Sequence, residues 1–371
     1  MTTKRLPFFA FYLVMIATVL VGCGRPPELL GVDNPEFPAA SVPEVSKHQI
    51  FITTTRQPFE ATGVLFSAQR ANKLGLASVD VTVPPNHVLG ELERARSLPP
   101  DPRREFAVVN PHIYKSENAF IADVNRALAK YPRGQRRLLI FIHGYNNTTS
   151  DAVLRLTQFV EDTEFQGVAV LYDWASAAKA PRYVYDLNSA LVARVKLKEM
   201  SDILSRTKAE GIDILGHSMG AFLTMEGLVD AQQAGRLGSR KAINHIMLAS
   251  PDIDIDLFRT QISLLPQSIK DKMYIFISAD DRALKFSRLI AGGIPRVGAF
   301  EAEQLENLGV TVIDLSKIEN SSSGSHSKFA GSPDVVQLIG TGLKSSGRFD
   351  ASHNSRIGDI LYKVPIRILR H

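Results

Sequence analysis

Short apolar runs alternate with longer segments of helical period through most of the chain, and no other feature constrains the fold as much. A run without polar positions, such as Leu-Leu-Ile-Phe-Ile at 138–142, is typical of a strand buried on both faces. The pattern predicts an α/β fold in which helices cover both faces of a mostly parallel central sheet. The predicted strands are Leu138–Ile142, Val168–Tyr172, Ile212–Leu215, Ile243–Ala249, Met273–Ser278 and Val310–Asp314. The predicted helices are Asp151–Phe165, Asn188–Lys208, Met219–Gln233, Asp256–Leu264, Ala283–Ala291 and Pro333–Leu343.

The segment ahead of this core follows a different pattern. It carries Ile-Phe-Ile-Thr-Thr-Thr, and later the alternating valines Val79, Val81 and Val83. This favours leading strands that extend the sheet in antiparallel fashion, with a separate small cap as the alternative. We expect one domain over residues 47–371, with N-terminal strands over 47–115, a core over 116–343 and a tail over 344–371.

The N-terminus has the layout of a secretory signal over residues 1–22. Lys4 and Arg5 precede an almost unbroken apolar run that falls short of the roughly 20 residues a transmembrane helix needs, so a permanent span is less favoured. The stretch Leu20-Val21-Gly22-Cys23 resembles the lipobox of bacterial lipoproteins, in which the cysteine is acylated. We therefore predict a palmitate-carrying Cys23, anchored in the bacterial cell envelope. The alternative is a cleaved signal with an incidental cysteine.

In a Gram-negative host, Gly24 after the cysteine favours the periplasmic face of the outer membrane. Residues 23–46 are rich in proline and predict a solvated, poorly ordered tether.

Composition excludes several function classes. The chain has 43 basic and 38 acidic residues, and loss of Lys4 and Arg5 with the signal leaves 41 against 38, a charge too small to argue for nucleic acid. One cysteine excludes an intramolecular disulfide, a thiolate zinc site and an iron–sulfur cluster. The histidines lack paired helical spacing and no glycine-rich phosphate loop is present, so we expect neither a metal nor a cofactor.

The segment Gly216-His217-Ser218-Met219-Gly220 matches the G-x-S-x-G pattern between an apolar strand and a helix. In that pattern a serine occupies a sharp, strained turn that exposes its hydroxyl, and glycines avoid collisions with neighbouring backbone. Ser218 is therefore the predicted nucleophile. The alternative is a helix start that happens to be flanked by glycines.

A serine nucleophile needs a histidine base held by a carboxylate, in the chain order Ser, Asp or Glu, His. The favoured base is His326, in a serine-rich loop before the last helix; His353 and His371 lie in the tail.

Three aspartates are candidates for the acid. Asp281 follows the predicted strand Met273–Ser278 and is favoured, with its neighbour Asp280 and the earlier Asp252 as alternatives. A capping role for these aspartates also stays open.

Backbone N–H groups of Tyr145 and Met219 are the predicted oxyanion hole. Tyr145 follows His143-Gly144 at the end of a strand, and Met219 follows the nucleophile. The alternative is a plain turn in which Asn146-Asn147 caps the next helix.

Four motifs in this order resemble a bacterial family of α/β-hydrolase-fold proteins of unknown function, over residues 48–343. They are Phe-Ile-His-Gly-Tyr-Asn-Asn, Leu-Gly-His-Ser-Met-Gly, Leu-Ala-Ser-Pro-Asp-Ile-Asp and Ser-Ala-Asp-Asp-Arg-Ala-Leu-Lys-Phe-Ser. The resemblance implies the α/β-hydrolase fold and a Ser-His-Asp triad with its acid at Asp281 and its base at His326. It implies no substrate. Gly216 stands where related sequences often carry alanine.

These observations favour a serine hydrolase that cleaves carboxylic esters through an acyl-enzyme, with thioesters or amides less favoured. An acyltransferase with the same triad and a non-catalytic envelope protein are the alternatives. No insertion of lid size is visible, so we expect a small-molecule ester or acyl substrate. Trp174, Tyr183 and Tyr185 are candidates for the pocket lining.

Overall fold

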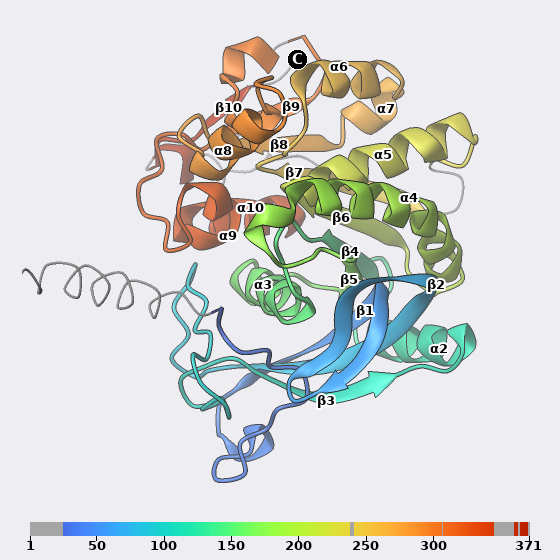
Figure 1. Cartoon of the computed structure of the whole chain (residues 1–371), viewed down its shortest axis with the longest axis vertical. Coiled ribbons are helices and arrows are strands. Elements are labelled where there is room, and N and C mark those ends of the chain that lie inside the picture. Colours follow the sequence, from blue (N-terminus) through green and yellow to red (C-terminus); the bar gives the residue numbers. More distant parts are fainter. Residues whose placement is uncertain (1–24, 238–240, 306, 345–359, 363, 370–371) are drawn as a thin grey trace, which may run out of the picture.

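The computed structural model describes residues 25–237, 241–305, 307–344, 360–362 and 364–369. In these ranges the strands form one ten-stranded sheet in the order β10-β9-β8-β7-β6-β4-β5-β1-β2-β3 (Figure 1). The strands are β1 (Ser46–Ala61), β2 (Val64–Val83), β3 (Ala107–Ile113), β4 (Arg137–Ile142), β5 (Val168–Asp173), β6 (Gly211–His217), β7 (Ala242–Ala249), β8 (Met273–Ile277), β9 (Thr311–Asp314) and β10 (Arg367–Leu369).

The predicted mostly parallel sheet and its antiparallel N-terminal extension are confirmed. Every pairing from β1 through β5, β4, β6, β7 and β8 to β9 is parallel. β2 and β3 add antiparallel strands beyond β1, so the alternative of a separate small cap is wrong. β10, from the predicted tail, pairs antiparallel with β9 at the opposite edge.

Helices cover both faces of the sheet, as predicted. The alternation of strand side chains explains this arrangement: Leu138 and Ile140 of β4 pack in one core with α2, α4, α5 and α6, whereas Leu139 and Phe141 pack in the other with α3 and α10. The helices are α2 (Glu117–Leu128), α3 (Thr149–Asp162), α4 (Tyr183–Ser205), α5 (Met219–Gln233), α6 (Ile255–Ser263), α7 (Gln267–Lys270), α8 (Arg282–Ile290), α9 (Lys328–Gly331) and α10 (Pro333–Lys344).

The sequence misplaced the start of α4 and did not predict α2, α7 and α9. α4 begins at Tyr183, ahead of the predicted start at Asn188, because a 3-10 turn over Ala180–Arg182 leads directly into it. α2 was not predicted from the sequence, although Ser116 caps it by accepting a hydrogen bond from Ala119 N.

The segment that follows Cys23 differs from the expected solvated tether. Leu29 and Leu30 are buried, and Leu30 bridges to Gly63 and Val108. Leu29 N also donates to the Ser150 hydroxyl at 2.9 Å. The physical reason is that the hydrophobic free energy gained by burying these two leucines exceeds the conformational entropy that the proline-rich segment loses when it is ordered.

The predicted signal over 1–22 and Cys23 itself lie outside the described residues. Among the residues that the structure does describe, no helix is both long and apolar enough to cross a membrane.

Candidate active site

Ser218 occupies a strained turn between β6 and α5. Its backbone has φ 55° and ψ −121°, a conformation that residues with a side chain rarely adopt. Ser218 N donates to the Ala249 carbonyl at 2.9 Å, and Ser218 O accepts from Asp252 N at 3.2 Å. These bonds to the end of β7 hold the turn in place, and strain of this kind is concentrated at functional sites.

The glycines on either side of Ser218 are required by close packing. A Cβ at Gly220 would lie 2.1 Å from the Ile142 carbonyl oxygen, and one at Gly216 would lie 2.8 Å from the Ala221 Cα. The first turn of α5 therefore lies directly against the end of β4. This packing brings the loop after β4, which carries Tyr145, next to Ser218.

His326 and Asp281 form a hydrogen-bonded pair. The His326 Nδ1 lies 2.7 Å from the Asp281 Oδ2, and the Asp281 side chain is fully buried. The second oxygen, Oδ1, accepts the backbone N–H of Leu284 and so caps α8. A carboxylate on Nδ1 fixes the imidazole tautomer whose Nε2 is available to take a proton.

His217 connects His326 to the turn that carries Ser218. The His217 Nε2 donates to the carbonyl oxygen of His326 at 3.2 Å, and the two rings lie 4.8 Å apart between centroids. Burial, and then the nearby charge of His326, holds the pKa of His217 well below its usual range, so His217 stays neutral. The sequence analysis gave this residue no role, although its place beside Ser218 was visible.

The alternative acids have other partners. Asp280 pairs with Lys328 Nζ at 2.9 Å and accepts from the Ser278 hydroxyl. Asp252 accepts from the Tyr183 hydroxyl at 3.0 Å and from the Ser287 hydroxyl at 2.6 Å. The geometry therefore favours Asp281 as the partner of His326. His353 and His371 lie outside the described residues.

The loop after β4 lies against Ser218. A Cβ at Gly144 would come within 2.9 Å of the Ser218 Cβ, and Tyr145 is the next residue. Met219 is the first residue of α5, where a backbone N–H has no partner within the helix. Asn147 Nδ2 donates to the carbonyls of Gly144 and Tyr145, at 3.1 and 2.8 Å, and braces the loop.

The alternative in which Asn146-Asn147 caps the next helix is wrong. The cap of α3 is Thr148, whose hydroxyl accepts from Asp151 N while the Asp151 carboxylate accepts from Thr148 N. This reciprocal capping box leaves the two asparagines available to shape the loop.

A buried ion pair between Arg56 and Asp173 holds the loop after β4 in place. Arg56 of β1 donates from Nε to Asp173 Oδ1 at 2.7 Å, and both side chains are almost fully buried. Its other nitrogens donate to the carbonyls of Ser176 at 2.8 Å and Asn147 at 2.9 Å. Burial alone would raise the pKa of Asp173, but Arg56 and then His143 outweigh it and lower the pKa to about 2.

Arg56 was missed, although a signal for it existed. Arg56 directly follows the run Ile-Phe-Ile-Thr-Thr-Thr, whose residues are all buried, and a charge that is buried with such a run needs a partner. The sequence could not identify that partner, because β5 follows β1 by more than a hundred residues.

The three predicted pocket aromatics do not share one cavity wall. Trp174 is fully buried, stacks on His143 at 5.0 Å and donates from Nε1 to the His143 carbonyl, so its predicted pocket role is wrong. Tyr183 packs edge-on against Tyr145 near Asp252, whereas Tyr185 lies under Arg70.

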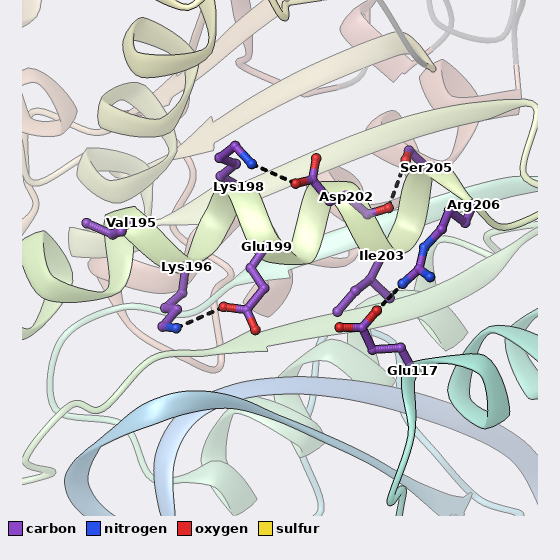
Figure 2. A pocket seen from close by; sticks show the side chains of 9 residues that line it. All are labelled: Glu117, Val195, Lys196, Lys198, Glu199, Asp202, Ile203, Ser205 and Arg206. Atoms are coloured by element: carbon purple, nitrogen blue, oxygen red, sulfur yellow. Dashed lines mark hydrogen bonds and ion pairs between the residues drawn. The ribbon is translucent and has the colours of Figure 1, made fainter.

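Two hollows in the described part of the chain lie away from Ser218, Asp281 and His326. One, shown in Figure 2, is a polar groove along α4, where Lys196 pairs with Glu199 and Lys198 with Asp202, each at 2.8 Å. The other is an apolar cavity of about 300 Å³ between α4, α5 and the sheet. Neither is lined by Ser218, Asp281 or His326. Within the described ranges, no cluster of three or more His, Cys, Asp or Glu could hold a metal.

Residues 116–342, more than half of the chain, match the model of a family described as alpha/beta hydrolase of unknown function (DUF900). The chain belongs to this family. The match includes Ser218, Asp281 and His326, and it begins only after β3, so that β1 and Arg56 lie outside it. Family membership supports a hydrolase and leaves the substrate unspecified.

No curated protein matches this chain. Among solved structures it is similar to a presumed cell surface hydrolase of Lactobacillus plantarum WCFS1, at 11% identity and a TM-score of 0.42, over 64% of this chain and 99% of that one. It is also similar to an esterase of Rhizomucor miehei, at 12% identity and a TM-score of 0.34, over 98% and 93%. Carboxyl esterase 2 of Tuber melanosporum matches at 11% identity and a TM-score of 0.37, over 90% and 98%. At these values the comparisons say nothing of the substrate.

The buried Arg56–Asp173 pair predicts a pH-dependent loss of stability. Arg56→Met leaves a buried carboxylate without its cation, so the free energy of unfolding at neutral pH should fall by about 3–5 kcal/mol. Because the folded-state pKa of Asp173 is depressed to about 2, the wild-type contribution is present above about pH 4 and is lost as the pH falls toward 2. The difference in the free energy of unfolding between variant and wild type, measured by urea denaturation, should therefore become smaller at acidic pH.

Arg126→Met is the matched control, since Arg126 forms an exposed pair with Asp123 on α2. It should change stability little at any pH. An equal loss in both variants, or a gap that does not vary with pH, would contradict this role for Arg56.

Proposed function

We propose that this protein is a serine hydrolase that cleaves carboxylic esters of small molecules. The observation that carries the proposal is the buried Asp281 carboxylate on Nδ1 of His326, with the backbone of His326 bound to the residue before a strained Ser218. This arrangement combines an oriented imidazole with a serine on the type of turn that nucleophiles use.

In the proposed mechanism the Ser218 hydroxyl attacks the ester carbonyl carbon as His326 takes its proton. The N–H groups of Tyr145 and Met219 bind the oxyanion, and Asp281 stabilises the imidazolium. His326 then returns the proton to the leaving alcohol, which departs and leaves an acyl group on Ser218. Water, deprotonated by the same imidazole, releases the acid and regenerates the serine.

Labelling with a fluorophosphonate probe tests the nucleophile. The wild-type chain should be labelled and Ser218→Ala should not, because the probe reacts with an activated serine hydroxyl. Ser67→Ala, a half-buried serine of β2 whose hydroxyl donates to the Gln57 carbonyl, is the matched control and should label like the wild type. Labelling that persists in Ser218→Ala would remove this residue from the mechanism.

Substitution of the acid tests the orientation of His326. Asp281→Asn keeps the shape of the side chain but loses the carboxylate, and should lower kcat on a p-nitrophenyl ester by up to ~10⁴. Asp252→Asn, which affects a carboxylate bound to Tyr183 and Ser287, is the comparison. A large loss only in Asp252→Asn would transfer the role to that residue.

We also propose that Cys23 carries the lipid that ties the protein to the cell envelope. The support is the lipobox-like sequence and the position of the chain's single cysteine. In cells fed an alkyne analogue of palmitate, the wild-type protein should incorporate the label and Cys23→Ser should not. Equal labelling of the two proteins would point to an acylation site other than Cys23 and rule out this anchor.

A further inference from the structure

The outer face of α8 exposes apolar side chains next to the candidate active site. The helix begins directly after Asp281 and turns Leu284 and Ser287 toward the interior. Phe286 and Leu289 on its other face are 56% and 76% exposed. Ile290 and the following Ile294 are also exposed, at 44% and 39%. Contiguous exposed apolar side chains of this kind mark an interaction surface.

The same helix is basic. Arg282, Lys285 and Arg288 are exposed, and no acidic residue occurs between Arg282 and Arg296. A helix with one buried stripe, an exposed apolar stripe and cationic flanks suits the interface of an anionic bilayer, where apolar side chains enter the acyl boundary and cations meet lipid phosphates. A second copy of this chain is the other occupant that the experiment below distinguishes.

The first described residue, Arg25, lies at the carboxyl ends of the parallel strands, as α8 does. We call this side of the sheet its carboxyl edge. Arg25 donates to the carbonyls of Asn146 at 2.8 Å and Ala178 at 2.5 Å, in the loops that follow β4 and β5, and it pairs with Asp151. Shortly after Ala178, the Tyr183 hydroxyl contacts the Ser287 hydroxyl of α8 at 3.0 Å. One residue separates Cys23 from Arg25 in the sequence.

We propose that Arg282, Lys285, Phe286, Arg288, Leu289, Ile290 and Ile294, the α8 surface, dock on an anionic lipid bilayer. Docking turns the carboxyl edge of the sheet, with Ser218 and His326, toward the lipid. Both Arg25 and α8 lie at this edge, so a lipid on the nearby Cys23 of the sequence and the α8 surface would engage one bilayer together. The docking stands on the exposed face of α8 and is independent of the proposed hydrolysis.

A fluorescent label at position 289 tests the docking in the full-length chain. Cys23→Ser removes the native thiol, and Leu289→Cys provides a single site for a nitrobenzoxadiazole dye. With vesicles of phosphatidylcholine and phosphatidylglycerol, the emission should shift to the blue and be quenched by spin-labelled lipid. The added changes Lys285→Gln and Arg288→Gln should lower the docking equilibrium constant about 30-fold, as expected for two basic residues at an anionic surface.

The matched control carries the dye at Arg133→Cys. Arg133 lies in the exposed loop before β4, at the amino ends of the parallel strands and so on the side of the sheet opposite to α8. Its emission should stay unchanged with the same vesicles, and circular dichroism verifies that both labelled chains are folded. If the 289 dye remains in water while the chain sediments with anionic vesicles, the proposal is wrong. A blue shift that depends on protein concentration without vesicles would overturn it in favour of contact between copies of the chain.

Discussion

The buried pair of Arg56 and Asp173 is the interaction on which the candidate site most depends. One guanidinium reaches three acceptors, the Asp173 carboxylate and the carbonyls of Asn147 and Ser176, and so ties β1, β5 and the loop after β4 into one unit. In a low-dielectric interior a charge without a partner is costly, so the three elements hold one arrangement. The loop that carries Tyr145 is thereby held in one position, as the proposed oxyanion role of Tyr145 requires.

A second carboxylate, Asp281, has two tasks at the far side of the site. One oxygen caps α8 through Leu284 N and the other binds His326, so the folding of a helix and the orientation of an imidazole depend on the same side chain. His217 adds a third connection, from the turn that carries Ser218 to the backbone of His326. The site is therefore held by contacts among loops that each follow a different strand, and the parallel sheet provides the common edge at which those loops meet.

The region outside the family match also contributes to the site. The match begins after β3, yet Arg56 on β1 anchors a loop inside the matched part. The N-terminal strands therefore extend the sheet and also hold a loop of the candidate site in place. The segment around Leu29 covers part of them and brings Arg25 to the carboxyl edge, where the α8 surface lies.

The sequence by itself determined the parallel sheet, the positions of most strands and helices, and the Gly-His-Ser-Met-Gly turn. These follow from local information, namely apolar periodicity and the need for glycine where backbones approach closely, and the structure confirms the fold. Only the tertiary structure decided which aspartate meets His326, since Asp280 and Asp281 are neighbours in the chain and differ in the direction their side chains take. It also decided that Trp174 belongs to the core and that Arg56 has a partner, because those contacts join residues that no local pattern relates.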